Sequence, residues 1–355
     1  MNDSRLDALR AQMRAQQLDA FILNEKANRY YLTGFTGTYG EALIAADDQF
    51  IIADGRYFEQ LKTQSPNFTV VDNHMRMVEA LNRLITDRGY QRIGIEAEYM
   101  NVSEYLGLKA SQATLVPTTD VIESLRMIKD LDEQKAIQKA GAIADETYQY
   151  ILGYIKPGMT EKQVANEIDR YGLAHGADAT AFETIVASGV RSALPHGHAS
   201  NKVIREHEMI IFDFGFMVDH YYSDITRTLA LGSVSSKLKE IYAVTLAAQK
   251  AAINACHAGV AMAEIDHVAR QVITDAGYGE YFLHGTGHGL GLTVHEFPLL
   301  NQDSQTDLQA HMTFTVEPGI YLAAQGGVRI EDDVWLDANG EPLVMTHSPK
   351  EFIEL

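Results

Sequence analysis

Two stretches of this 355-residue chain follow the same plan, 101 residues apart. Three positions of the earlier stretch recur in the later one: Gly158 as Gly259, Val164 as Ile265 and Gly176 as Gly277. Each stretch is followed by strand-like segments that carry two acidic residues. Three matching positions can arise by chance, but the acidic residues that follow each stretch make this weak internal repeat informative.

A helical period marks the start of the earlier stretch, through Ile137, Ala140, Ala144, Tyr148 and Ile151. This period predicts an amphipathic helix that lies on a sheet and ends at Pro157-Gly158. Thr160 followed by Gln163 predicts a capping box, which opens a second helix that ends near Gly176.

The first third of the chain has a different pattern. Helical segments such as 77–88 alternate with short β-like segments at 20–23, 42–45, 50–53, 92–95 and 114–116. This alternation predicts an α/β domain, in which Asp54-Gly55-Arg56 forms a turn between a strand and a helix. A break at 117–120 then places the boundary near residue 122. We therefore expect an α/β domain over 1–122 and an α+β domain over 123–355.

The composition of the chain indicates its cellular compartment and excludes some classes of binding partner. No apolar run is long enough to cross a bilayer, and residues 1–18 lack the pattern of a signal peptide. Cys256 is the only cysteine, which excludes an internal disulfide and fits a reducing compartment. We expect a cytoplasmic protein with Cys256 buried. The net charge of −19 opposes binding to nucleic acid or to anionic membranes.

The first acid pair lies in the segment MIIFDFGFMVDHYYSDITRTLAL, residues 209–231. Its β-branched and aromatic residues predict two strands. A hairpin that turns at Val218-Asp219 would place Asp213 opposite Asp224, with Cβ atoms about 4.5–5.5 Å apart. Like charges opposed in this way are destabilising unless a cation lies between them.

The second acid pair is built in the same way, from residues 313–322 and 327–336. A turn centred on Ala324 would bring Glu317 against Glu331, with Arg329 on the same face as Glu331. Either pair alone is compatible with the wet side of a sheet. The two pairs together with the histidines described next indicate a metal site.

Three histidines, His284, His288 and His295, lie in the glycine-rich segment HGTGHGLGLTVHEFP, residues 284–298. The glycines let the backbone approach a metal or ligand closely, whereas a phosphate loop would need a lysine and a helix start. His196 lies in a separate, proline-marked loop. The DFG triplet at 213–215 also occurs in kinases, but the glycine-rich loop and paired lysine of a kinase do not precede it.

Taken together, the motifs resemble those of the pita-bread metallopeptidases, specifically aminopeptidase P and prolidase, which cleave Xaa-Pro bonds. The motifs are DFG with YSDITRT, HGTGHGLGLTVHE, TVEPG and RIEDD, in the expected order within residues 182–336. The segments NRYYLTGFTG (28–37) and DGRY (54–57) extend the resemblance to the N-terminal domain. The resemblance implies a creatinase-like α/β domain followed by a pita-bread catalytic domain with a pseudo-twofold repeat.

The resemblance also implies a role for each site residue. The ligands of two divalent metal ions would be Asp213, Asp224, His288, Glu317 and Glu331. His196 and His295 would contact the scissile peptide and pass protons. Four further residues would support the ligands or contact the substrate: His284, Arg329, Tyr222 and Thr226.

The charges of this ligand set agree with two divalent ions, because four carboxylates would be neutralised only by a loaded site. Oxygen ligands with one imidazole suit Mn²⁺, Co²⁺ or Zn²⁺, and the resemblance favours Mn²⁺. Two such ions would activate a water molecule, so no side-chain nucleophile is expected. The resemblance further implies a homodimer that takes proline-containing peptides as substrate.

One departure from the family pattern bears on specificity. Many prolidases have an arginine shortly after the VHE motif, thought to hold the free carboxylate of a dipeptide, and Leu299 stands there instead. A leucine cannot pair with a carboxylate. We therefore expect an Xaa-Pro aminopeptidase that acts on longer peptides. The alternative is an Xaa-Pro dipeptidase (prolidase) in which Arg191 or a residue of the N-terminal domain replaces the arginine.

Two other classes share this fold, a metal-free creatinase-like hydrolase and a non-enzymatic peptide-binding module. The five filled ligand positions disfavour both. Methionine aminopeptidase shares the metal site but normally lacks a domain like residues 1–122.

Overall fold

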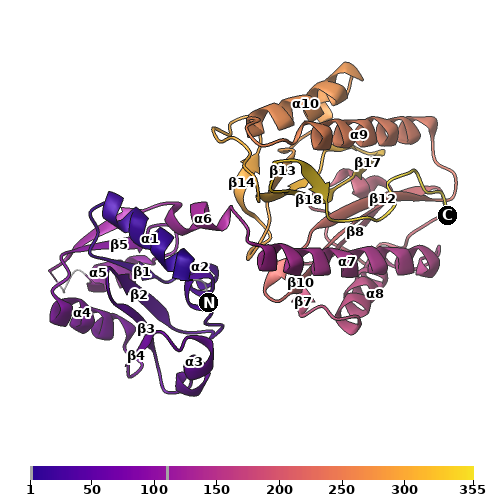
Figure 1. The fold of residues 1–355 in the computed structure, drawn as a ribbon. Helices are drawn as coiled ribbons and strands as arrows, with labels where there is room; N and C mark the ends of the chain where they lie inside the picture. The colour runs from indigo at the N-terminus through magenta and orange to yellow at the C-terminus, as the bar shows by residue number, and fades with distance from the viewer. Residues whose placement is uncertain (1–2, 109–111) are drawn as a thin grey trace. The chain divides into compact units, whose positions relative to one another are not determined.

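The computed structural model describes residues 3–108 and 112–355. The chain forms two compact units, Met1–Arg126 and Met127–Leu355, and each is described by itself (Figure 1). The units divide at the end of α6 (Val121–Arg126), whereas the sequence pattern placed the boundary near residue 122.

The first unit is built on a six-stranded sheet of order β4-β3-β2-β1-β5-β6. Its strands are β1 (Ala20–Leu23), β2 (Glu41–Ala45), β3 (Gln49–Ala53), β4 (Thr69–Asp72), β5 (Arg92–Glu96) and β6 (Thr114–Thr118). Its other helices are α1 (Asp3–Ala15), α2 (Lys26–Thr33), α3 (Phe58–Gln64), α4 (Met77–Arg88) and α5 (Val102–Leu108). The expected α/β domain is confirmed.

The local sequence signals of this unit agree with its structure. Strands occur at all five expected segments, and α4 spans the predicted residues 77–88. Ala80 and Leu84 of α4 join one core cluster with Ile22 and Ile52 of the sheet, as the apolar face of an amphipathic helix does. The turn at 54–56 is also confirmed, because the Asp54 carboxylate accepts hydrogen bonds from the backbone N–H and the guanidinium of Arg56.

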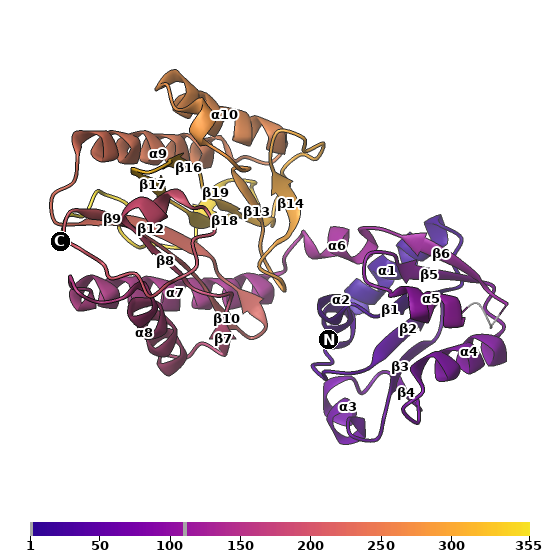
Figure 2. The ribbon, with the colours of Figure 1, turned by 180° about the vertical axis from the view of Figure 1, so that it is seen from behind.

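The second unit places its long helices on two sides of a group of small sheets. Figures 1 and 2 show α7 and α8 on one side of the strands and α9 and α10 on the other. The helices are α7 (Leu131–Tyr154), α8 (Glu161–Ala174), α9 (Ser236–Ala255) and α10 (Met262–Asp275), with 3₁₀ turns η2 (Gly189–Ala193) and η3 (Gly279–Tyr281).

The strands of the second unit form four sheets, of orders β12-β9-β8, β11-β10-β7, β14-β13-β15-β18-β19 and β16-β17. The earlier strands are β7 (Ala179–Thr180), β8 (Ile185–Ser188), β9 (Glu208–Phe214), β10 (Phe216–Val218), β11 (Tyr221–Tyr222) and β12 (Ile225–Leu231). The later strands are β13 (Gly287–Gly289), β14 (Glu296–Leu300), β15 (Thr313–Val316), β16 (Gly319–Leu322), β17 (Gly326–Arg329), β18 (Asp332–Leu336) and β19 (Pro342–Val344).

The internal repeat is visible in the helices, since α8 and α10 begin and end 101 residues apart. The capping box predicted at Thr160 and Gln163 is present at the start of α8. Gly176 and Gly277 follow the two helices with φ of 109° and 84°, a conformation that favours glycine. These two glycines recur because each helix ends in the same backbone conformation.

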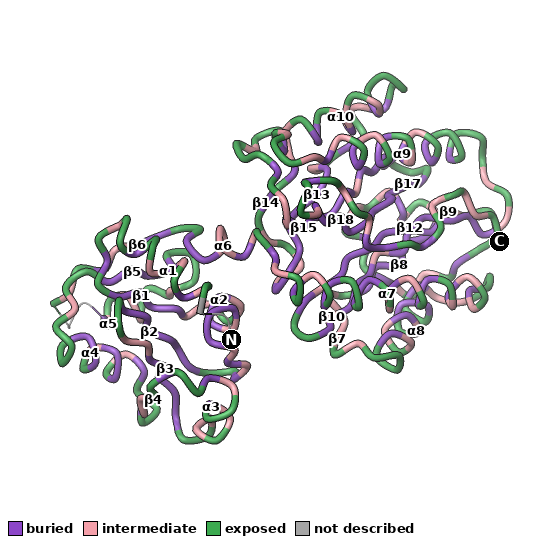
Figure 3. The backbone as a smooth tube through the Cα atoms, in the orientation of Figure 1, coloured by how far each residue is buried: buried purple, intermediate pink, exposed green. Residues whose placement is uncertain are grey.

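Burial follows the layers of the second unit: its strands are largely buried and the outer helix faces are exposed (Figure 3). The five residues that predicted the amphipathic helix all lie on the buried face of α7. Cys256 is buried, as expected. No helix within residues 3–108 and 112–355 is both long and apolar enough to span a membrane.

Candidate metal centre

The first acid pair stands at one end of the β9–β12 ladder, where Asp213 pairs with Thr226. The predicted direct opposition of Asp213 and Asp224 is therefore wrong. The turn lies at Asp219-His220, whose φ angles are 51° and 73°, one residue beyond the predicted position. A tight hairpin turn needs positive φ at both central residues, which Asp tolerates and a β-branched residue such as Val218 does not.

This shift preserves the face on which the first acid pair lies. Moving the turn by one residue moves each cross-strand partner by two, and side chains two positions apart share a face. Asp213 and Asp224 are thus diagonal neighbours, and both line one cavity.

The second acid pair has the predicted register. Strand β16 pairs with β17 so that Gly319 faces Arg329, around a turn at Ala324. The β15–β18 ladder continues the same register beyond the acids. Glu317 and Glu331 lie opposite each other in the gap between these two ladders, and their backbone N–H groups donate to the carbonyl oxygens of Thr286 and Thr226.

Both acid pairs meet at a cavity of about 400 Å³. All five predicted metal ligands line it, together with the predicted residues His196, His284, His295 and Arg329. Apolar side chains form another part of its wall: Phe182, Ile185, Pro195 and Leu299. Residues from both halves of the repeat therefore share one polar centre beside an apolar surface.

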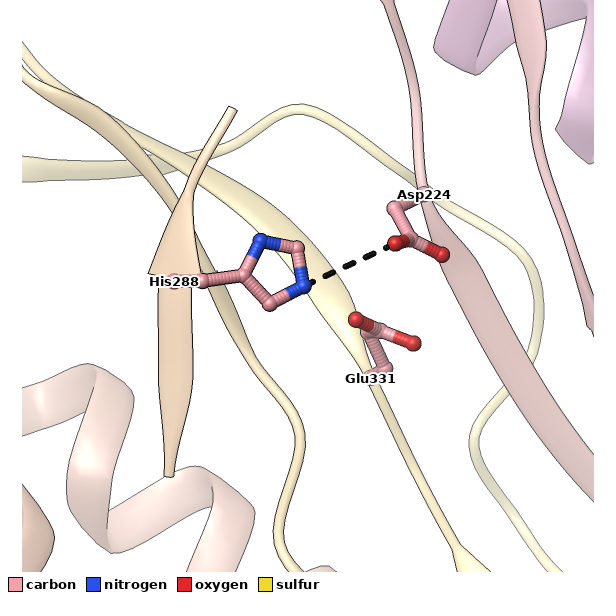
Figure 4. Close-up of side chains that lie close together, drawn as sticks. All are labelled: Asp224, His288 and Glu331. Carbon is pink, nitrogen blue, oxygen red and sulfur yellow. Dashed lines mark ion pairs between the residues drawn. The ribbon is translucent and has the colours of Figure 1, made fainter. Parts of the chain in front are cut away.

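Three of the expected ligands that line this cavity point toward one another (Figure 4). Asp224, His288 and Glu331 each offer a ligand atom, and these atoms lie within 4.8 Å of one another. His288 Nε2 is 3.7 Å from Asp224 Oδ2 and 3.4 Å from Glu317 Oε1. His288 Nδ1 is 3.0 Å from the Gly289 carbonyl oxygen, which leaves Nε2 free to face the acids, as metal-binding histidines do.

Arg329 and Thr226 connect the two acid pairs. Arg329 Nη2 donates to Asp213 Oδ2 at 2.5 Å, and Arg329 Nε donates to Thr226 Oγ1 at 3.1 Å. Thr226 Oγ1 in turn donates to Glu331 Oε2 at 2.6 Å. The guanidinium also donates to Tyr321 Oη at 2.8 Å. These contacts agree with the supporting role that the resemblance implied for Arg329 and Thr226.

Without a metal ion, the negative charges of the buried acids are poorly compensated, and their pKa values are raised. Burial raises the pKa of Glu317 to about 8. Burial and the neighbouring carboxylates raise the pKa values of Asp224 and Glu331 as well. Asp224 Oδ1 is buried without a hydrogen-bond partner among the described residues. A divalent cation would supply the missing counter-charge and a partner for that oxygen, so the residues fit a metal ion.

The other histidines have different surroundings. His284 Nε2 lies 2.8 Å from Tyr321 Oη, and burial lowers the pKa of His284 to about 4, so its ring is neutral. The His295 ring has its centroid 4.3 Å from that of His288, and partial burial lowers its pKa. His196 reaches the cavity from the loop after η2.

Tyr222, which the resemblance implied as a supporting or substrate-contacting residue, lies outside the cavity lining. Its backbone N–H donates to the Gly291 carbonyl at 3.0 Å. This bond joins the strand before Asp224 to the segment after His288. Tyr222 therefore contacts the histidine segment through its backbone.

Three residues that the sequence did not predict support the expected ligands, directly or through Arg329. Thr315 Oγ1 accepts from the His288 N–H at 3.2 Å and donates to Glu317 Oε1 at 3.4 Å. The carboxylate of Asp333 accepts from the Asp224 N–H at 3.2 Å, and Tyr321 links His284 to Arg329. The two-residue spacing of Thr315 and Glu317 was a usable signal, since it puts them on one strand face. Asp333 has the same spacing from Glu331, but its contact with Asp224, on a distant strand, has no local signal.

The structure also places Leu299 and Arg191, the two residues on which the choice between aminopeptidase and dipeptidase depends. Leu299 pairs with His288 in the β13–β14 ladder and lines the cavity. Arg191 does not line the cavity, and its Nε lies 3.0 Å from Glu161 Oε2. Arg191 is thus committed to a buried acid, so the geometry does not support it as a replacement for the arginine that Leu299 displaces.

Comparison with known proteins gives the family. Residues 135–338 match the metallopeptidase family M24, and residues 5–128 match the creatinase/prolidase N-terminal domain. The solved Xaa-Pro dipeptidase from Bacillus anthracis is 41% identical, with a TM-score of 0.97 over 99% of both chains. The Xaa-Pro dipeptidase of Pyrococcus horikoshii is 38% identical over 96% of both chains. The solved X-Pro aminopeptidase from Thermotoga maritima is 35% identical, with a TM-score of 0.89 over 97% of this chain and 100% of that one.

These matches cover nearly the whole chain, and they confirm the creatinase-like domain followed by a pita-bread domain. The chain belongs to the metallopeptidase family M24.

Proposed function

We propose that the protein is an Xaa-Pro dipeptidase (prolidase) dependent on two divalent metal ions. The observation that carries the proposal is the convergence of four carboxylates and one imidazole on a single cavity. The named dipeptidases of Bacillus anthracis and Pyrococcus horikoshii, similar over nearly the whole chain, support dipeptides as substrate. This choice departs from the expectation of an aminopeptidase that rested on Leu299.

An Xaa-Pro aminopeptidase is the second candidate. Leu299 favours it, because this side chain lines the cavity and cannot pair with the carboxylate of a dipeptide. The similarity to the X-Pro aminopeptidase of Thermotoga maritima also supports this second candidate.

We assign Asp213, Asp224, His288, Glu317 and Glu331 as the metal ligands. The unpartnered Asp224 oxygen and the raised pKa values of the buried acids support this assignment. Mn²⁺ is the proposed ion, because mostly oxygen ligands suit it, with Co²⁺ and Zn²⁺ as alternatives. Bound divalent metal supplies Lewis-acid activation of water and of the peptide carbonyl.

The remaining residues bind the peptide and move protons. The apolar wall of Ile185, Pro195 and Leu299 suits the proline ring. His295 is neutral near pH 7 because its pKa is lowered, so its ring nitrogen can take a proton during the reaction. His196 lines the same cavity, and we propose that it contacts the scissile peptide. The homodimer and the cytoplasmic location stay predictions.

The test compares kcat/KM of the Mn²⁺-loaded protein for an Xaa-Pro dipeptide and for the matching Xaa-Pro-Yaa tripeptide. A dipeptidase should favour the dipeptide by about tenfold or more, which corresponds to about 1.4 kcal/mol of transition-state stabilisation. A preference for the tripeptide would support the aminopeptidase. The Xaa-Ala dipeptide is the control for the proline requirement, and failure to cleave either proline peptide with any of the three metals would contradict both candidates.

A further inference from the structure

A buried acid outside the metal centre binds an unusual number of donors. Glu161, the first residue of α8, has a fully buried side chain. Its carboxylate accepts from the backbone and hydroxyl of Ser188, both at 2.8 Å, and from the backbone and hydroxyl of Ser200, at 3.1 and 2.6 Å. Arg191 Nε donates a further bond at 3.0 Å. The charge is thus fully compensated inside the protein.

The donors lie at the two ends of one segment. Residues 189–199 leave the end of β8, carry His196 and His198 to the cavity, and return at Ser200. Glu161 therefore joins the base of this segment from both sides. Arg191 extends the network toward the histidines, since its Nη2 donates to the carbonyl oxygen of His198 at 2.5 Å.

The middle of the segment contacts the metal centre. The carbonyl oxygen of Pro195, next to His196, accepts from Arg329 Nη1 at 3.1 Å. Arg329 also binds Asp213, one of the proposed ligands. The backbone at His196 is thus held between Glu161 at the base of the segment and Arg329 at its tip.

We propose that Glu161 is a positioning residue of the peptidase, which holds segment 189–199 so that His196 faces the scissile peptide. The inference rests on the proposed contact between His196 and the substrate. Replacing Glu161 with glutamine keeps the shape but removes the charge that Arg191 requires and part of the acceptor capacity. A displacement of about 1 Å in a substrate-contacting group can lower the rate about 100-fold.

The first test compares Glu161→Gln with Glu167→Gln. Glu167 lies on the same helix and is bound by Arg170 and Tyr150, so it controls for the loss of a carboxylate paired with an arginine. We expect Glu161→Gln to lower kcat on an Xaa-Pro substrate by about 10- to 100-fold with unchanged Mn²⁺ affinity by calorimetry. Glu167→Gln should stay within about twofold of the parent. An unchanged kcat, or a loss of Mn²⁺ binding, in Glu161→Gln would overturn the proposal.

A double-mutant cycle separates positioning from general damage. If Glu161 acts through His196, Glu161→Gln should lower kcat/KM by less than about twofold in a His196→Ala background. Equal losses in both backgrounds would show that Glu161 acts elsewhere and would overturn the proposal. Ser200→Ala removes one hydroxyl donor from Glu161 and should show the same pattern with a smaller loss, which keeps the test decisive should Glu161→Gln not fold.

Hydrogen exchange tests the same inference without catalysis. Glu161→Gln should speed amide exchange within residues 189–199 and leave strand β15 unchanged. Unaltered exchange in the segment would overturn the inference even in an active peptidase. Conversely, a parent protein that cleaves no Xaa-Pro peptide would contradict the proposed function, while faster exchange in the variant would still show that Glu161 holds the segment.

Discussion

The two halves of the catalytic unit have matching helices but present their acids differently. Helices α8 and α10 begin and end 101 residues apart. In the first half, Asp213 lies inside the β9–β12 ladder, opposite Thr226, and only Asp224 lies in the gap between this ladder and the β10–β11 ladder. In the second half, Glu317 and Glu331 face each other in a gap between two ladders. The repeat therefore determines where the acids meet, while each strand pair determines its own register.

The halves also hold their histidine-bearing segments with acids at different helix positions. Asp266 in α10 accepts from the backbone and hydroxyl of Thr286, both at 3.0 Å, and from Arg270. Arg270 donates to the carbonyl oxygen of His284, as Arg191 does to that of His198. The position that corresponds to Glu161 is occupied by Met262. A similar arrangement of acid and arginine thus occurs in each half at non-equivalent positions.

The largest expected effect comes from removing one proposed ligand in each half. Asp224→Asn and Glu331→Gln should each lower kcat by about 1000-fold or more, because each removes a charge from the shared metal site. The folds should stay intact, since the pKa values of both acids are already raised by burial and by neighbouring acids. Circular dichroism and steady-state kinetics check this. Near-native turnover in one variant alone would remove that half from the ligand set.

The next expected effect concerns the metal-free protein, in which the four acids have only Arg329 as a shared positive partner within the part of the chain that the structure describes. The pKa of Glu317 is raised to about 8, against about 4.3 in an unfolded chain. Between these values the folded state binds more protons than the unfolded state, so the free energy of unfolding should fall as pH rises through this window. Each kcal/mol lost lowers Tm by roughly 2–4 °C for a domain of this size. Thermal unfolding at pH 5 and pH 8, with and without Mn²⁺, measures this; a Tm that rises with pH in the chelated protein would contradict it.

A smaller effect is expected when the acid of the second half is neutralised. Asp266→Asn leaves Arg270 without its acidic partner and should lower the free energy of unfolding by about 1–3 kcal/mol. His284 should shift with its segment, and kcat/KM should fall about tenfold because Tyr321 and Arg329 follow. Chemical denaturation and kinetics beside Glu161→Gln show whether the two halves respond alike. A loss in only one variant would show that the resemblance between the two arrangements has no functional meaning.

A substitution at Leu299 should change the preference between dipeptide and tripeptide substrates by a factor no larger than the tenfold expected for Asp266→Asn. Leu299→Arg would place a cation at the cavity wall and should raise the kcat/KM for an Xaa-Pro dipeptide about tenfold, the usual range for one charge-assisted hydrogen bond. The tripeptide should gain less, because its carboxylate lies farther from the scissile bond. Equal gains for both peptides would show that Leu299 lies away from the carboxylate. Leu299→Met is the matched control of similar volume.

The smallest effect is expected at Cys256. This residue follows α9 as Ile155 follows α7, 101 residues earlier, and both are buried. Burial raises the pKa of Cys256 to about 12, so iodoacetamide should leave the native protein unmodified and active. Cys256→Ala should change kcat/KM by less than about twofold. Mass spectrometry after alkylation and a parallel assay check both points, and rapid modification would show that the second half opens.

Much of the fold was predictable because its signals are local. The helical period of α7, the capping box at Thr160 and the glycines after α8 and α10 involve residues within one or two turns of each other. The first hairpin was misplaced by one residue because the pattern of strand residues continues through its turn. Only the backbone preference of Asp219-His220 separates the two registers.

The sequence by itself determined the repeat, the strand faces and the side chains that meet at the cavity, because strand alternation places Asp213 and Asp224 on one face in either register. Only the tertiary structure showed how these side chains are held. Thr226 reaches Glu331, Asp333 reaches Asp224, and Glu161 joins both ends of segment 189–199. These contacts join residues far apart in the chain, so no local spacing predicts them. The contacts of Thr226 and Asp333 also require the two halves to pack together.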